Sequence, residues 1–167
     1  SGWDGPAQRD FDRPLNARGR EAGRAIGREL HDLGIGFDSI IASPAIRVVE
    51  TLAGVAETFG PLDPRFDERV YLAPAPTLLK IVHETEDEYD RLLIVGHNPG
   101  MERLALLLAR QDKLHEQVAL KFPTGALAEI RFAVESWGEI AGGTGTLALF
   151  IRPGELDPGL RPDGDND

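Results

Sequence analysis

The stretch that most constrains the fold covers residues 91–100 and reads Arg-Leu-Leu-Ile-Val-Gly-His-Asn-Pro-Gly. The four consecutive apolar residues 92–95 predict a strand buried on both faces, because a half-exposed strand would alternate apolar and polar side chains. Asn98 followed by Pro99 is typical of a helix start, with Asn98 as the candidate N-cap. We therefore expect His97 at the carboxyl end of a buried strand, beside a helix N-terminus.

This position has a functional meaning in open α/β sheets. Ligands bind there at the carboxyl ends of strands, where helix N-termini offer free N–H groups and a partial positive charge to anions. His97 is therefore predicted to face a ligand. A histidine in such a turn can also be a structural hydrogen-bonding residue, and a second junction of the same kind favours the ligand interpretation.

The second junction lies earlier in the chain. Residues 38–42 predict a short strand, and Ser43 with Pro44 repeats the cap-then-proline pattern before a helix that ends near Gly60. Parallel strands that each lead into a helix bring their carboxyl ends to one edge of a sheet. The two junctions are therefore expected to converge.

Arg47 lies in the first turn of that second helix. A guanidinium there can bind an anion bidentately and add a full charge to the partial charge of the helix end. The alternative is a surface salt bridge with Glu50 or Glu57. We interpret Arg47 and His97 together as the core of an anion site.

Apolar periodicity and the positions of glycine and proline predict the other elements. Gly23 and Gly27, on one helix face, predict close packing of that helix on a sheet. The remaining elements are a loop over 1–15, a helix over 17–33, an irregular connection over 61–76 with a short strand near 69–72, a helix over 77–83, a helix over 99–110, and two paired strands over 127–132 and 146–151.

Strands that alternate with helices predict an α/β fold, with a mostly parallel sheet covered on both faces. The helix over 17–33 has no strand before it, so the first strand of the pattern is missing from the given chain. We expect one domain over residues 1–151 and a loose tail rich in proline, glycine and aspartate over residues 152–167.

Composition narrows the possible partners. The 167 residues carry a net charge of −10, which argues against nucleic acid and anionic membranes as partners. No apolar run is long enough to span a membrane and no signal peptide is visible, so the cytoplasm is the default location. With no cysteine and four histidines that are far apart, the sequence predicts neither a metal site nor a cofactor.

Several short motifs share one family pattern, in order and spacing. They are Asp12-Arg13-Pro14-Leu15-Asn16 with Gly19, Ser43-Pro44-Ala45-Ile46-Arg47 with Glu50-Thr51, Tyr71-Leu72-Ala73, Gly96-His97-Asn98-Pro99-Gly100, Phe122-Pro123-Thr124-Gly125-Ala126 and Arg152-Pro153. Together they resemble the histidine phosphatase superfamily, specifically its SixA-type phosphohistidine phosphatase branch. The resemblance covers nearly the whole chain and implies a three-layer α/β/α fold like that of phosphoglycerate mutase.

The resemblance also implies a mechanism without metal or cofactor. A nucleophilic histidine, preceded by arginine at the end of the first strand, is expected a few residues upstream of Ser1 and is absent from this chain. Arg47 and His97 would hold the phosphoryl oxygens, fixed cations being effective at such sites. Ser1 could bond the same oxygens, and Asn98 would orient the loop or cap the helix.

The resemblance favours phosphohistidine in proteins as the substrate. The connection over 61–76 offers Asp67 and Glu68 as candidate general acids, and neither is favoured; an imidazole leaving group needs a strong acid less than an alkoxide does. The alternatives are a small-molecule phosphomonoesterase and a non-catalytic phosphate-binding or phosphoprotein-binding module. A serine hydrolase is disfavoured because no Gly-x-Ser-x-Gly motif occurs and Ser43 is assigned as a cap.

Overall fold

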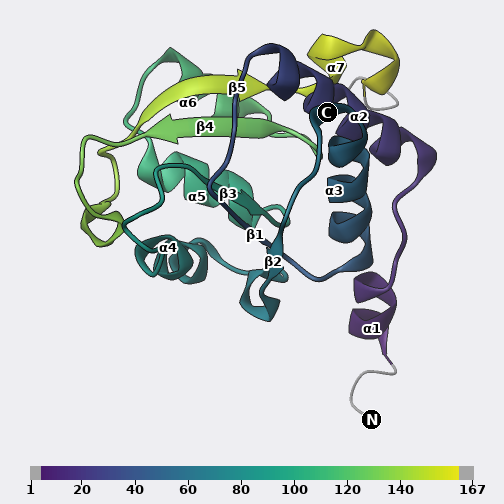
Figure 1. Ribbon diagram of the computed structural model, residues 1–167, viewed down its shortest axis with the longest axis horizontal. Coiled ribbons are helices and arrows are strands. Elements are labelled where there is room, and N and C mark those ends of the chain that lie inside the picture. The colour runs from purple at the N-terminus through teal and green to yellow at the C-terminus, as the bar shows by residue number, and fades with distance from the viewer. Residues whose placement is uncertain (1–4, 162–167) are drawn as a thin grey trace.

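The computed structural model describes residues 5–161. Three short 3-10 helices cover Glu68–Val70, Trp137–Glu139 and Pro158–Leu160. The helices and strands in chain order are α1 (Pro6–Phe11), α2 (Ala17–Asp32), β1 (Ser39–Ala42), α3 (Ile46–Phe59), β2 (Arg65–Phe66), α4 (Ala75–His83), β3 (Leu92–Val95), α5 (Gly100–Leu108), α6 (Lys113–Leu120), β4 (Leu127–Arg131), β5 (Thr146–Ile151) and α7 (Pro153–Leu156) (Figure 1).

A parallel sheet in the order β2-β1-β3 forms the centre of the fold. Successive side chains of β1 point to opposite faces of this sheet. Ile41 packs with Leu78 of α4 and Leu104 of α5, whereas Ala42 packs with Val48 and neighbouring residues of α3. Helices thus cover both faces, and the predicted α/β fold with a parallel sheet is confirmed.

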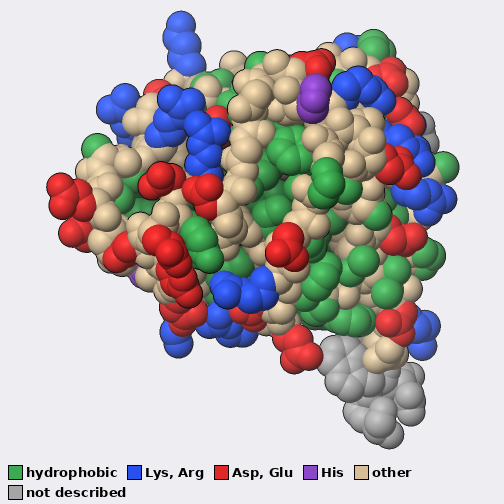
Figure 2. Space-filling view, in the orientation of Figure 1, with side chains coloured by type: hydrophobic (Ala, Val, Ile, Leu, Met, Phe, Trp, Pro, Cys, Tyr) green, Lys and Arg blue, Asp and Glu red, His purple; other side chains and the backbone are tan. Residues whose placement is uncertain are grey.

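Strands β4 and β5 form a separate antiparallel pair, as predicted for these two segments. Within the described chain, neither β3 nor β4 has a strand on its second side. A cavity of about 460 Å³ lies between β4 and the segments that lead into β1 and β3. Figure 2 shows hydrophobic side chains gathered in the middle of the face of the molecule that is turned to the viewer. The two sheets therefore present open edges.

The open edge explains one wrong prediction. We expected residues 92–95 to be buried on both faces, but all four residues of β3 are only partly buried. The apolar run is typical of a central strand, whereas β3 lies at the edge of its sheet.

Four further segments differ from the predictions. Residues 113–120, for which no element was predicted, form α6. Residues 6–11, predicted as part of a loop, form α1, with Pro6 in the first helical turn. No strand forms near residues 69–72; the nearby strand is β2, and a 3-10 helix follows it. Residues 152–161, which we expected to begin a loose tail, contain α7, in which Pro153 is buried, and Arg152 donates to the Lys121 carbonyl.

The division of the chain at residue 151 stays a prediction. Among the described helices, none combines the length and the apolar character that crossing a membrane requires.

Candidate functional site

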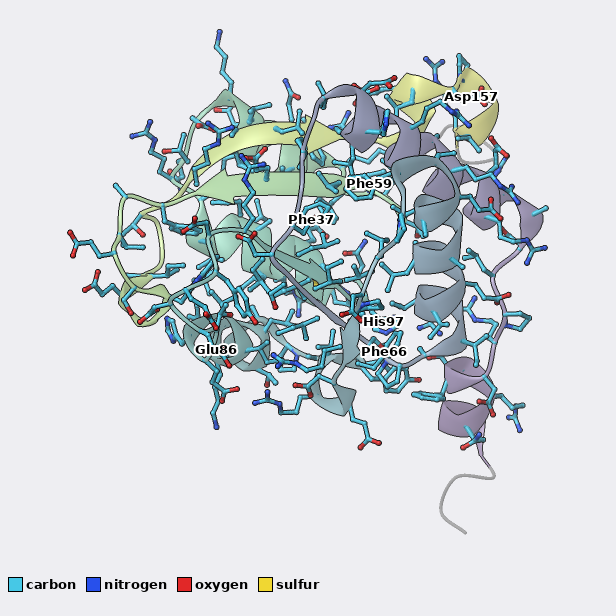
Figure 3. All side chains as sticks on the ribbon, in the orientation of Figure 1. Phe37, Phe59, Phe66, Glu86, His97 and Asp157 are labelled. Carbon is cyan, nitrogen blue, oxygen red and sulfur yellow. The ribbon has the colours of Figure 1, made fainter. Side chains whose placement is uncertain are left out.

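Arg47 and His97 lie side by side at the carboxyl ends of the parallel strands. Arg47 Nη2 is 3.1 Å from His97 Nδ1. The sheet causes this proximity: Ala42 is in register with Val95, and the Ser43 N–H donates to the Val95 carbonyl at 3.0 Å. Figure 3 shows His97 beyond the ends of β1 and β2. The predicted convergence of the two junctions is confirmed.

The second ring nitrogen of His97 faces Ser43. Nε2 lies 2.7 Å from Ser43 Oγ, which also accepts the Ala45 N–H at 3.2 Å. A guanidinium can only donate, so Nδ1 accepts from Arg47 and the ring proton sits on Nε2, from which it is donated to Ser43. Both ring nitrogens therefore have a protein partner.

The surroundings of His97 keep its imidazole neutral. His97 is 9% exposed. Burial, followed by the charge of Arg47, lowers the pKa of His97 from 6.5 to about 4, and the charge of Asp10 opposes this shift. At neutral pH the ring is uncharged and acts as a hydrogen-bonding link between a cation and a hydroxyl.

Ser43 does not have the role that we expected from the sequence. Helix α3 begins at Ile46 with Ala45 in the N-cap position, so Ser43 lies outside the cap. Its side chain is 0% exposed and holds the His97 ring in place. A hydroxyl that no reagent or substrate can reach is not a nucleophile, which agrees with the expectation against a serine hydrolase.

Two further side chains complete the site, Asp10 of α1 and Tyr71. The Tyr71 hydroxyl donates to Asp10 Oδ2, and Arg47 Nη2 donates to the same oxygen at 3.2 Å. Arg47 Nη1 donates to the Asp10 carbonyl at 2.8 Å. The Tyr71 ring lies edge-on to His97, with centroids 5.3 Å apart.

These contacts set the charge of the site. The hydrogen bond from Tyr71, followed by the charge of Arg47, holds the pKa of Asp10 below its usual value, although burial acts in the opposite direction. Burial and the Asp10 carboxylate raise the pKa of Tyr71. At neutral pH the group thus contains a guanidinium, a carboxylate, a neutral phenol and a neutral imidazole.

The other two predicted site residues are Asn98 and Ser1. Asn98 does not cap α5: Pro99 is in the N-cap position, and Asn98 Nδ2 instead donates to the Phe122 carbonyl at 3.0 Å. Asn98 therefore fixes the loop after His97, which was its alternative role. Ser1 lies outside the described residues. Substrate binding by Asn98 and by Ser1 stays a prediction.

The remaining histidines lie in other contacts. His83 Nε2 is 2.7 Å from the Ile140 carbonyl, and His115 Nε2 is 3.0 Å from the Leu106 carbonyl. Over residues 5–161 no group of three or more His, Asp or Glu side chains is placed to hold a metal ion. The cavity of about 460 Å³ is lined by neither Arg47 nor His97. A smaller one of about 140 Å³ borders Asn98.

Sequence reasoning missed Asp10 and Tyr71 for different reasons. Asp10 belongs to a short helix that reads as a loop, and its contact with Arg47 spans 37 residues of sequence. Tyr71 stands in one of the motifs that carry the family resemblance, but nothing in its neighbours predicts its hydroxyl contact. No local sequence pattern predicts that the Asp10 carboxylate lies this close to a candidate anion site.

Comparisons with known proteins find one family model and several relatives. The model of the histidine phosphatase superfamily (branch 1) matches residues 3–130. An uncharacterized protein of Mycobacterium tuberculosis is 35% identical over 149 residues, covering 86% of this chain and 91% of the relative. An uncharacterized protein of Mycobacterium leprae is 30% identical over 129 residues, covering 74% and 77%.

Solved structures extend the likeness to the fold. A candidate phosphohistidine phosphatase SixA from Nakamurella multipartitia has a TM-score of 0.77 and 26% identity, covering 89% of this chain and 90% of its own. A candidate phosphohistidine phosphatase SixA from Agrobacterium tumefaciens has a TM-score of 0.74 and 28% identity, covering 90% of both chains. The protein histidine phosphatase SixA complexed with tungstate, at 19% identity and a TM-score of 0.71, covers 88% of both chains and shares the fold.

Proposed function

Because this chain belongs to the histidine phosphatase superfamily, in its branch 1, we propose that it is a metal-independent phosphatase acting through a phosphohistidine intermediate, with phosphohistidine in proteins as its substrate. The contact between Arg47 and His97 supports this proposal most directly. It brings a fixed cation and an imidazole to the carboxyl edge of a parallel sheet, where small anions bind.

Arg47 would hold the equatorial oxygens of the phosphoryl group. Phosphoryl transfer depends mainly on positioning and on charge stabilisation, which a guanidinium supplies with little reorganisation. His97 would act at a later stage of binding. A phosphoryl dianion beside the ring favours the protonated imidazolium, whose Nδ1–H could then turn from Arg47 to a phosphoryl oxygen.

The proposal requires a nucleophile that the printed sequence does not contain. Of the four histidines, His97 is the one within the site, and the other three, His31, His83 and His115, lie in other contacts. The nucleophilic histidine is therefore expected upstream of Ser1, at the end of a further strand. The edges of β3 and β4 support such a strand, because within residues 5–161 neither has a strand on its second side.

The state of the nearby carboxyl group supports the proposed substrate class. Asp10 is the carboxyl group bonded to Arg47, and its lowered pKa makes it a poor proton donor. The alkoxide that leaves from a phosphoester needs a proton donor. Imidazole, which leaves from phosphohistidine, is a better leaving group and needs one less. Phosphohistidine therefore suits the site better than a sugar phosphate.

The contact between Arg47 and His97 also supports a second candidate function. The chain could be a phosphate-binding or phosphoprotein-binding module that keeps Arg47 and His97 without turnover. A small-molecule phosphomonoesterase remains the alternative among enzymes.

The test compares the complete product of the gene with its Arg47→Ala variant. We expect hydrolysis of a histidine-phosphorylated protein, resistant to EDTA, with kcat/KM falling about 100-fold or more in the variant because the phosphoryl clamp is lost. The control is Arg24→Ala, which removes a guanidinium that pairs with Glu57 on the neighbouring helix α3. Phosphate release from the histidine-phosphorylated protein and from p-nitrophenyl phosphate is measured in parallel.

Each alternative predicts a different result. Binding of vanadate without turnover would favour the binding module, and faster turnover of p-nitrophenyl phosphate would favour the phosphomonoesterase. Loss of activity in EDTA would contradict the metal-free mechanism.

A further inference from the structure

The guanidinium of Arg47 is already bound to an anionic side chain. Both of its terminal nitrogens contact Asp10: Nη1 donates to the carbonyl oxygen and Nη2 to the carboxylate oxygen Oδ2. A pair of parallel N–H donors on one edge of a guanidinium is the arrangement that binds carboxylate or phosphate oxygens bidentately. Asp10 thus occupies an edge that an incoming phosphoryl group could use.

Asp10 approaches Arg47 from the solvent side. The side chain of Arg47 is 17% exposed and that of Asp10 is 34% exposed, so the carboxylate is the outer member of the pair. Nη2 also lies 3.1 Å from His97 Nδ1, to which it donates its second proton. With both protons of Nη2 engaged, an external anion cannot bind this nitrogen until one of the two partners leaves.

Asp10 is the partner that an incoming anion displaces first, and His97 would turn only after the anion is bound. Arg47 extends from α3, and His97 is held by Ser43 at the end of the central sheet. Asp10 lies on α1, a six-residue helix at the margin of the molecule (Figure 1). Its carboxylate also has the Tyr71 hydroxyl on Oδ2 and a longer contact of 3.5 Å from Arg13 to Oδ1, so it keeps partners after it separates from Arg47.

We propose that Asp10 is an internal anion that occupies the Arg47 site and lowers the affinity of the site for phosphoryl groups until one displaces it. The proposal rests on the proposed function only in taking Arg47 as the phosphoryl-binding cation. The lowered pKa of Asp10 means that the carboxylate stays charged at neutral pH, so displacement depends on the competing anion rather than on protonation.

The opposite role for Asp10 makes the opposite prediction. If its carboxylate mainly positions Arg47 for the ligand, its removal should weaken anion binding. The Arg47 contacts to the Asp10 carbonyl and to His97 do not depend on the carboxylate, so we expect the guanidinium to keep its orientation without it.

The experiment measures orthovanadate binding to this chain by isothermal titration calorimetry. We expect Asp10→Asn to lower the Kd for vanadate about fivefold, because it removes a competing charge within a few ångströms of the bound anion. Asp12→Asn is the matched control: Asp12 is exposed, lies two residues away and bonds Gln8, and its change removes the same charge. Its Kd should change less than twofold.

Asp10→Ser gives a second removal of the carboxylate, in case the asparagine variant misfolds, and circular dichroism checks both folds. Tighter binding in folded Asp10 variants but not in Asp12→Asn supports the proposal. Unchanged or weaker binding in the Asp10 variants overturns it. This result is separate from turnover: a complete gene product that fails to hydrolyse phosphohistidine would refute the proposed function, whereas the vanadate series would still decide the role of Asp10.

Discussion

At the scale of single residues, His97 is the histidine whose titration the fold changes most clearly. Its pKa falls from 6.5 to about 4 because the ring is buried and faces Arg47. In the unfolded chain the same ring has no such environment. Between these two pKa values the unfolded state binds a proton that the folded state does not, so the free energy of unfolding must fall as the pH falls through this window.

We therefore expect His97 to make the protein acid-sensitive. Its contribution to the free energy of unfolding should drop by about 2 kcal/mol between about pH 7 and about pH 4.5, and change little below the folded pKa. The measurement is urea unfolding across this range for the wild type and for His97→Gln. The glutamine variant should be less stable at neutral pH, and its disadvantage should shrink as the pH is lowered.

A difference between the two proteins that stays constant from neutral to acid pH would show that His97 titrates normally. The comparison of wild type with variant cancels the contributions of other titrating groups, including Asp10, whose lowered pKa acts at lower pH.

The site residues differ in how far the sequence could predict them. Arg47 and His97 each follow a predicted strand, and two adjacent parallel strands bring their carboxyl ends together, so their contact follows from the pattern. Asp10 and Tyr71 reach the site through loops and a short helix, where no periodicity specifies direction. Ser43 was predicted as a cap. Its burial against His97 could not be predicted, because this contact depends on the register of β1 with β3.

At the scale of elements, the close packing of α2 on α3 depends on glycines. Gly23 and Gly27 were expected to pack on a sheet, but they face α3 instead. A Cβ on Gly27 would lie 2.4 Å from the Val55 carbonyl oxygen and 2.3 Å from Thr58 Oγ1. The Thr58 hydroxyl donates to the Arg24 carbonyl at 2.7 Å, so the two backbones are linked where they approach.

Gly27→Ala should therefore separate these two helices. We expect a loss of about 2 kcal/mol in the free energy of unfolding, because overpacking against backbone outweighs the gain of about 1 kcal/mol in helix propensity. Gly19→Ala in the same helix is the control: its Cβ would meet mainly the Leu15 side chain, which can rotate away. Thermal and urea unfolding measure both variants, and an equal effect of the two would contradict the packing argument.

The elements that the sequence predicted carry a local signal, which is a short apolar run in β1 and β3 and a period or turn signal in the others. Helices α2 and α3 carry apolar faces over several turns, and β4 and β5 show alternation or turn signals. Strand β2 has two residues and α1 has six, too few for any period. Their positions depend on pairing with β1 and on contact with the site, which are non-local.

At the scale of the whole molecule, β1 is the strand with neighbours on both sides in the described chain, whereas β3, β4 and β5 each pair on one side. We expect the amides of β1 to exchange with deuterium more slowly than those of β3 and β4, because open edges exchange through smaller local openings. Hydrogen–deuterium exchange with mass spectrometry or NMR measures the order. If β4 is protected as strongly as β1, its second edge is covered.

The same measurement on the complete gene product tests the expected first strand, which should protect β3 or β4 further. Alternation of strands and helices was sufficient to predict the fold class. The separation of the strands into two sheets was not predictable from the sequence. The neighbours of a strand and its register depend on contacts with residues far away in the chain.

The side chains of the site come from positions 10, 43, 47, 71 and 97, and none comes from β4 or β5. The antiparallel pair can therefore accumulate substitutions over evolutionary time, provided that its apolar face is kept. Remote kin of this protein should be recognised by those five positions rather than by overall similarity, and their counterparts of β4 and β5 are free to diverge.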